Sequence, residues 1–384
     1  MTLRVPVQAE MLAWARERSR LPAEDLFHRF PGLASWEDGS KQPTLKQLEK
    51  FASATHTPVG YLFLPTPPEE PLPVPDFRTI GDAEIGHASP NLLDTIYQCQ
   101  QRQDWYRDYA RVNREDPIPF VGSLRVGSDV VAAATAMRET LQFAPDNRGG
   151  SWSEAFRLLA EEADRHGVLV MVNGVVGSNT HRKLDPDEFR GFALADDLAP
   201  VVFVNGADTK AAQIFTLAHE LVHIWLGESA ISDADMVRTP KNATERWCNK
   251  VAAEFLVPAL SLQGFALDRD NITASLEQLA KRFKVSTLVA LRRLYDTKFI
   301  TEAQYHDEFS DELARILAIM EERDQGKSGG SFYNTQPVRM SKRFTRALIE
   351  STLEGQTLRR DAFEMLGFKK VSTFDELAVR MGVR

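Results

Sequence analysis

The feature that most restricts the fold of this chain is a run of closely spaced prolines from Pro65 to Pro75. Proline fixes φ and lacks an amide donor, so such a run enters neither a helix interior nor a central strand. It indicates a stiff, extended linker that follows an N-terminal domain. A second break is the glycine-rich stretch Gln325–Ser331, where the backbone is free to bend. We therefore predict domains at residues 1–65, 95–325 and 326–384, with the proline-rich linker over 66–94.

The composition is typical of soluble multidomain proteins. The 384 residues suffice for two or three buried cores, and 43% hydrophobic with 26% charged residues is ordinary for such proteins. No apolar run approaches the roughly 20 residues of a membrane span, and the N-terminus lacks the apolar stretch of a secretory signal. Cys99 and Cys248 are too few for a disulfide framework. We expect a cytoplasmic protein with no membrane association.

Charge is unevenly distributed along the sequence. The net charge of −8 argues against a protein that coats nucleic acid without specificity. From Arg323 to the C-terminus, however, twelve basic residues stand against seven acidic ones. This basic segment, which includes Lys342–Arg343 and Arg359–Arg360, is a candidate surface for nucleic acid, although ordinary solvated helix faces explain it more simply.

The spacing of apolar residues predicts an α+β protein that is mostly helical. Before the proline run, apolar residues recur at helical spacing and predict a compact bundle of about four short helices. In the middle of the chain, short apolar runs predict strands and longer amphipathic stretches predict helices. The predicted strands are 167–173, 189–194 and 201–206, and the predicted helices are 153–166, 209–226 and 244–256. We expect a small sheet that precedes the principal helices of the middle domain.

The predicted helix 209–226 contains His219, Glu220 and His223. Histidines four residues apart project from one face of a helix at the spacing that a single tetrahedral zinc ion requires. Glu220 is badly placed to bind the same ion but well placed to deprotonate a water on it, and this water would attack a peptide carbonyl. An accidental match is expected in about one of a hundred such chains. We therefore interpret these residues as a zinc-peptidase site rather than as solvated side chains on a helix surface.

A catalytic zinc ion needs a third protein ligand and an open fourth position. Glu245 and Glu254 both lie on the predicted helix 244–256. They are nine residues apart, about two and a half turns, and so occupy roughly opposite sides of that helix. Only one of them can face the metal, and their spacing does not decide which. Cys248 is a further conceivable ligand, although a cysteine in the middle of a helix more often simply packs.

Together these segments resemble the ImmA/IrrE family of zinc metallopeptidases. The resemblance rests on Phe215–His223, on Arg190–Gly191–Phe192 and Pro200–Asn205 before it, and on Cys248–Asn249 and Ala252–Pro258 after it. Residues 276–294 look like the helical extension that such domains carry, which would begin at about residue 270, and Phe332–Thr335 resembles the tail of longer, regulator-fused members. The sequence departs from the common pattern at Val222, where glycine is frequent, and at Val257, where methionine is frequent.

The resemblance implies a fold and a set of roles. It implies a zincin-like domain in which His219, His223 and Glu245 bind zinc and Glu220 is the general base. It also implies a protein substrate such as a repressor or antitoxin, because members of the family are proposed to cleave such proteins. The predicted strand Val201–Asn205 would suit an extended substrate if it lies at the edge of the sheet. An ordinary strand, paired on both sides, is the alternative.

The N-terminal bundle resembles the Xre-type helix-turn-helix domains of phage repressors and HigA-like antitoxins. The resemblance rests on Leu12–Arg18, Leu26 and Ser35–Lys50. Such domains place the second helix of the motif in the major groove. In this chain the segment between Leu26 and Trp36 is about four residues shorter than usual, and the polar residues expected at the start of the recognition helix are missing. Pro31–Gly32 shortens the helix further.

Four basic residues are the candidate DNA contacts of this bundle: Arg16, Arg18, Arg29 and Lys41. Side chains of this kind bind phosphates and position a domain on double-stranded DNA without reading its sequence. Acidic residues nearly balance them, so a charged bundle used for homodimerisation or for docking a partner is the alternative.

Two functions are consistent with these features. In the first, a cytoplasmic regulator cleaves a protein partner at a zinc-dependent endopeptidase site, and its N-terminal domain directs it to DNA or to that partner. In the second, the chain is a non-proteolytic DNA-binding transcriptional regulator or the antitoxin of a toxin–antitoxin system. The first function predicts bound zinc and cleavage that depends on Glu220. The second predicts operator binding that depends steeply on salt and not on Glu220.

Overall fold

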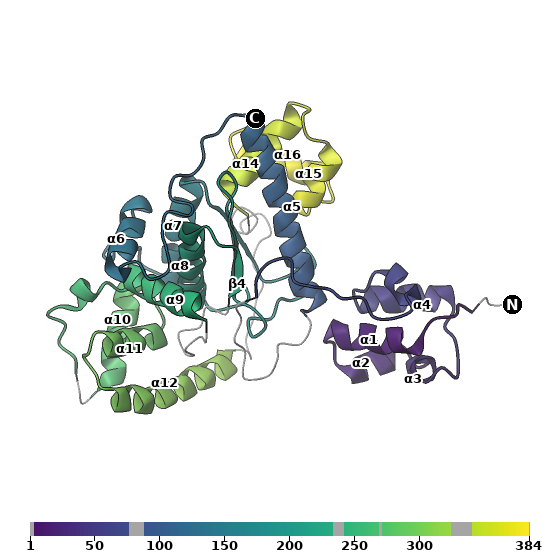
Figure 1. Ribbon diagram of the computed structural model, residues 1–384, viewed down its shortest axis with the longest axis horizontal. Coiled ribbons are helices and arrows are strands. Elements are labelled where there is room, and N and C mark those ends of the chain that lie inside the picture. The colour runs from purple at the N-terminus through teal and green to yellow at the C-terminus, as the bar shows by residue number, and fades with distance from the viewer. Residues whose placement is uncertain (1–3, 77–87, 233–241, 269–270, 324–339, 384) are drawn as a thin grey trace. The chain divides into compact units, whose positions relative to one another are not determined.

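The computed structural model describes residues 4–76, 88–232, 242–268, 271–323 and 340–383 (Figure 1). The chain forms two compact units. The first comprises Met1–Pro73 and Ala83–Tyr97, and the second comprises Val74–Asp82 and Gln98–Arg384. The predicted break Gln325–Ser331 and the segment Phe332–Thr335 lie outside the described residues. No helix within the described ranges is long and apolar enough to cross a membrane.

The first unit is a bundle of short helices, as the apolar spacing predicts. Leu12, Leu33 and Phe51 are fully buried in its core, and the rings of Phe30 and Trp36 pack edge-on against Phe51. The elements are α1 (Ala9–Ser19), α2 (Ala23–Arg29), α3 (Leu33–Glu37), α4 (Leu45–Ala54) and the 3-10 helix η1 (Val59–Phe63). The third helix has only five residues, in agreement with the shortened segment seen in the sequence.

The second unit combines a small sheet with many helices, so the α+β expectation is confirmed. Its strands are β1 (Leu169–Asn173), β2 (Gly191–Leu194), β3 (Val201–Asn205) and β4 (Ala230–Ser232). Its helices before the C-terminal segment are α5 (Pro90–Val112, shared with the first unit), α6 (Val130–Thr140), α7 (Trp152–Arg165), α8 (Lys210–Leu226), α9 (Ala243–Leu256), η2 (Ala259–Leu262), α10 (Ile272–Phe283), α11 (Thr287–Asp296) and α12 (Glu302–Arg323). The three predicted strands and the three predicted helices are each present within about two residues of their expected bounds.

The sheet has the order β1-β3-β2-β4, with β1 parallel to β3 and the other neighbours antiparallel. Strand β4 is absent from the sequence prediction because its three residues show no alternation. Strand β3 pairs on both sides, so the proposal that it forms the substrate-accepting edge is wrong. The interior alternative is the correct one.

Both faces of the sheet are covered, which explains why every residue of β3 is buried. On one face Val202 and Val204 join the core that contains α7 and α8. On the other face Phe203 stacks on Phe192, and the sulfur of Met171 in β1 lies 3.8 Å from Cys99 of α5. Figure 1 shows α7 and α8 on one side of the strands and α5 on the other.

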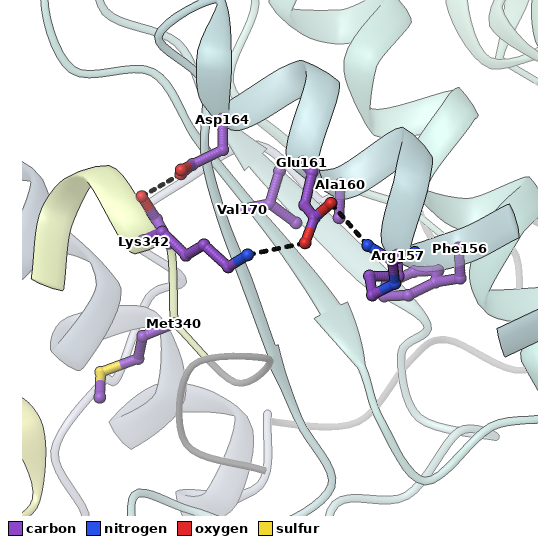
Figure 2. Close-up of a pocket in the computed structure, with 9 residues that line it drawn as sticks. Phe156, Arg157, Ala160, Glu161, Asp164, Val170, Met340 and Lys342 are labelled. Atoms are coloured by element: carbon purple, nitrogen blue, oxygen red, sulfur yellow. Dashed lines mark hydrogen bonds and ion pairs between the residues drawn. The ribbon is translucent and has the colours of Figure 1, made fainter. Parts of the chain in front are cut away.

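Within residues 340–383 the C-terminal segment has the helices α14 (Lys342–Leu353), α15 (Arg359–Leu366) and α16 (Val371–Arg380). Asp164, at the end of α7, accepts hydrogen bonds from the Ser341 hydroxyl and from the Arg343 amide, the latter at 3.0 Å. These contacts cap the N-terminus of α14. Figure 2 shows Lys342 ion-paired with Glu161 of α7 at 2.7 Å, beside a small pocket of about 230 Å³. The segment is therefore attached to the core of the second unit.

Candidate metal centre

Helix α8 carries the His–Glu–x–x–His motif through the centre of the unit. The Thr209 side chain caps its first turn by accepting from the Ala212 amide, and Gly227 ends it with a left-handed φ of 71°. Between these ends every residue from Gln213 to Leu226 is buried, because the helix packs on β2, β3, α7 and α9. The interpretation of the motif as solvated surface side chains is therefore wrong.

Glu245 of α9 joins His219 and His223 at a single point. Its carboxylate oxygens lie 3.1 Å from Nε2 of His219 and 3.0 Å from Nε2 of His223. The two Nε2 atoms are themselves 3.2 Å apart. All three side chains are at most 1% exposed. Among the described residues these three form the group of His, Cys, Asp or Glu side chains whose ligand atoms lie close enough to share one ion.

These separations are close to the edges of a small coordination polyhedron. Ligand bonds of about 2.0 to 2.2 Å around a tetrahedral ion place neighbouring ligand atoms about 3.3 to 3.6 Å apart. The three observed distances, 3.0 to 3.2 Å, are slightly shorter than this range. Two imidazoles and one carboxylate are also a frequent donor set of catalytic divalent metal sites. The residues present therefore fit a bound divalent cation.

Burial and mutual charge together set the protonation of the cluster. Burial alone would raise the pKa of Glu245, but His219 and His223 outweigh it and lower this pKa to about 2. Burial would lower the pKa of His219, and Glu245 outweighs it and raises that pKa. The carboxylate is thus held ionised, as metal binding requires, whereas the raised pKa of His219 means that a bound ion would have to displace a proton from this imidazole.

Glu220 lies beside the cluster and has a different environment. It is fully buried, and burial raises its pKa to about 7, against the opposing effect of both motif histidines. The Ser232 hydroxyl of β4 donates to Oε1 of Glu220. Its second oxygen, Oε2, is buried and makes no hydrogen bond within the described part of the chain. A carboxylate with a pKa near neutrality and one unused oxygen is suited to accept and return a proton.

Two neighbours of Glu220 were not identified as site residues from the sequence. Ser232 follows the motif at a distance that no spacing rule predicts, and it reaches Glu220 only because β4 pairs with β2. In the sequence, Gly191 of β2 contributes only to the family resemblance, and no local pattern indicates that it contacts the site. A Cβ atom on Gly191 would lie 2.6 Å from Thr216 and 3.2 Å from Cγ of Glu220, so glycine allows β2 to pack directly on α8.

The two alternative ligands on α9 have other partners. Glu254 is ion-paired with Arg293 of α11 and accepts from the Ala259 amide at 3.2 Å. This pair stabilises the junction between α9 and the helices that follow it. Cys248 is fully buried, burial raises the pKa of its thiol well above the ordinary value, and it packs in the hydrophobic core. The ambiguity left by the sequence is therefore resolved towards Glu245.

The four candidate DNA contacts of the N-terminal bundle differ in their surroundings. Arg16 is paired with Glu37 at 2.8 Å. Arg18 is 6% exposed, is bound by both carboxylate oxygens of Glu70 and also donates to the His56 carbonyl. Arg29 and Lys41 are exposed at the surface. Arg16 and Arg18 are thus engaged by carboxylates of the bundle itself.

Two ranges of the chain match models of known domain families. Residues 163–295, about a third of the chain, match the IrrE N-terminal-like domain, Peptidase_M78, a metallopeptidase-type family. The matched range includes all three residues of the metal cluster and supports the resemblance of the central domain to the ImmA/IrrE family. Residues 340–380, which form α14 to α16, match a domain of unknown function, DUF8813. No curated protein and no solved structure matches the chain.

Proposed function

We propose that the chain is a zinc-dependent endopeptidase that cleaves a protein partner such as a repressor or an antitoxin. The observation that carries this proposal is the convergence of two imidazoles and one carboxylate within 4.8 Å, all buried, with a second carboxylate alongside. Zinc favours two nitrogens, one oxygen and an open fourth position in catalytic sites. The match of the central domain to a metallopeptidase-type family supports the same reaction.

Each residue has a distinct role in this proposal. His219, His223 and Glu245 would hold the ion, which when bound lowers the pKa of water and polarises a peptide carbonyl. Glu220 accepts the proton of the attacking water on its unused oxygen, Oε2, and delivers it to the amine that leaves as the peptide bond breaks. Ser232 holds the other oxygen of Glu220 and so orients the carboxylate.

The sheet edge nearest to Glu220 suggests where an extended substrate would lie. Strand β4 is the edge strand on this side, and Ser232 belongs to it. Its outer edge is partly occupied by the chain itself, since the Ile231 amide donates to the Pro75 carbonyl at 2.9 Å and Asp76 forms an isolated bridge with Ile231. We assign β4, in place of the interior strand β3, as the strand along which a peptide would be added.

The replacement Glu220→Gln tests the proposal. Gln keeps the shape of the side chain and still accepts from Ser232, but it cannot take a proton. We expect the metal content, measured by elemental analysis, to stay at the level of the unmodified protein. Cleavage of β-casein, or of the product of an adjacent gene, is expected to fall at least about a hundredfold.

Glu228→Gln is the matched control, because this exposed glutamate lies just beyond the end of α8. It is expected to leave both metal content and cleavage unchanged. Purified unmodified protein without a divalent metal would overturn the metal centre, and full cleavage by the Glu220→Gln protein would overturn the assigned base. Operator binding that persists unchanged in Glu220→Gln, in a protein that cleaves nothing, would instead support the non-proteolytic regulator.

A further inference from the structure

A second cavity lies among elements that the proposed reaction does not use. It is a pocket open to solvent, lined by the part of α5 near Arg102, by the loop Val176–Arg182 that follows β1, and by the chain from Phe363 to Lys369 at the end of α15. Its volume is about 660 Å³. Cavities of about 300 to 1,000 Å³ are the size that holds metabolites. None of the residues that line it belongs to the metal cluster.

Hydrogen bonds between its three walls hold the cavity in shape. Nε of Arg102 donates to the Met365 carbonyl at 3.1 Å, and the Ser178 hydroxyl donates to the Gly367 carbonyl at 3.1 Å. Gly367 has a left-handed φ of 69°, and a Cβ on it would lie 2.5 Å from the oxygen of Ser178. The loop thus fits against a turn that only glycine forms comfortably. A preformed cavity of this kind binds a ligand without a large ordering cost.

Arg102 is the residue that points to a ligand. Its side chain is half-buried, and this burial lowers the pKa of its guanidinium. It contacts a carbonyl of Met365, the sulfur of Met171 at 3.7 Å and the thiol of Cys99. Among the described residues no carboxylate forms an ion pair with it. A guanidinium has five N–H donors, and a charge that is partly removed from water is stabilised by an opposite charge. An anion bound in the pocket would supply that charge beside Arg102.

The remaining lining residues favour the same class of ligand. Arg182 and Lys369 add positive charge, and Glu364 is the one acidic side chain in the lining. Hydroxyl and amide groups of the loop add neutral donors, while Phe363 and Val176 offer apolar surface. This combination suits a molecule with an anionic group at one end and a less polar body.

We propose that this cavity binds a small organic anion, whose phosphate or carboxylate group pairs with Arg102. The site joins two parts of the molecule, because the loop belongs to the range that matches the IrrE N-terminal-like domain and Phe363–Lys369 belongs to the range that matches the domain of unknown function. The loop also leads towards β2, which packs on Glu220. An effect of the anion on cleavage rests on the proposed function, whereas the binding itself does not.

Titration calorimetry on the full chain tests the binding. The probes are glycerol 3-phosphate, succinate and inorganic phosphate at constant ionic strength, with glycerol as the uncharged comparison. We expect at least one of the three anions to bind and glycerol not to bind. The phosphate and succinate arms distinguish the two kinds of anionic group. The absence of binding by all three anions would overturn the proposal.

Two variants locate the site. Arg102→Met keeps the length of the side chain and removes its charge, and it is expected to weaken binding at least about tenfold. Arg346→Met is the matched control, since this exposed arginine of α14 does not line the cavity. Equal binding by Arg102→Met and the unmodified protein would overturn the site. If near-ultraviolet circular dichroism shows that Arg102→Met does not fold, Lys369→Met at the exposed rim takes its place. We expect Lys369→Met to raise the dissociation constant of the anion. An unchanged dissociation constant would contradict the site.

Discussion

Gly191→Ala tests whether the contact between β2 and α8 positions Glu220, the proposed general base. An added Cβ would lie 2.6 Å from Cγ2 of Thr216, 2.8 Å from the Phe203 carbonyl oxygen and 3.2 Å from Cγ of Glu220. The Phe203 oxygen is backbone of the neighbouring strand β3, so it cannot turn aside as a side chain can. Either the two strands separate or α8 moves away from the sheet.

The size of the effect follows from this overlap. Overpacking by one methyl group in a dense core costs about 1 to 3 kcal/mol of folding stability. A displacement of a catalytic group by about 1 Å costs about a hundredfold in rate. We therefore expect Gly191→Ala to lower the midpoint of thermal unfolding and to lower kcat/KM about a hundredfold, while the metal content stays the same because Glu220 is not a ligand.

The measurements are thermal unfolding, elemental analysis and cleavage kinetics, each compared with Gly60→Ala. Gly60 lies in η1 with no atom within 4 Å of an added Cβ, so its replacement adds the same methyl group without a clash. Thr216→Ser removes one of the clashing atoms and is expected to restore part of the activity when combined with Gly191→Ala. If Gly191→Ala behaves like Gly60→Ala in both stability and activity, the contact does not position Glu220 and the reasoning fails.

Two other replacements probe the surroundings of the centre. Ser232 donates to the ionised form of Glu220 and lowers the pKa of this carboxyl group. Ser232→Ala is therefore expected to raise the pKa of Glu220 and to move the acidic limb of the pH profile of kcat/KM to higher pH. An acidic limb that does not move would argue against this contact. Arg148 donates to the carbonyls of Leu256 and Phe283 at 2.6 and 2.8 Å, at the ends of α9 and α10. Arg148→Met leaves these carbonyls unpaired and is expected to lower the free energy of unfolding in urea by about 2 to 5 kcal/mol. A decrease below about 1 kcal/mol would contradict this.

Local features of the site could be predicted from the sequence, because they depend on spacing within one element. The helix with the motif begins at Lys210 and ends at Leu226, against a prediction of 209–226, since its cap and its apolar pattern are both visible in the sequence. The facing of His219 and His223 follows from helical periodicity alone. The same is true of the opposite facing of Glu245 and Glu254.

The choice between these two glutamates could not be predicted from spacing, because it depends on the rotation of α9 about its own axis. That rotation is set by the packing of α9 on α8 and α6, and by the pairing of Glu254 with Arg293 of α11. The partner of Glu254 lies 39 residues further along the chain. Information of this range is absent from any local pattern, and the family resemblance supplied it instead.

The order of the strands in the sheet also could not be predicted from local sequence patterns. The apolar run Val201–Val204 predicts a strand, which the structure has, but says nothing about which neighbours pair with it. The three residues of β4 are too few to predict a strand, yet they bring Ser232 to Glu220. Glu220 therefore has the Ser232 hydroxyl as its hydrogen-bond donor because of the order of the strands in the sheet.

A substrate peptide that adds to β4 would have to displace the linker residues that already pair with this strand. A peptide that pairs along the outer edge of β4 competes with Pro75, whose carbonyl already accepts from Ile231. One such hydrogen bond contributes about 0.5 to 1.5 kcal/mol, and the burial of Val74 beside it about 1.5 to 3 kcal/mol. Displacing the linker therefore costs a free energy of about 2 to 4.5 kcal/mol, which lowers the apparent affinity for a substrate by about thirtyfold to two-thousandfold. A peptide that forms several backbone hydrogen bonds can offset this cost. The linker contact is thus strong enough to disfavour short or poorly matched peptides and weak enough to yield to a long, well-matched one.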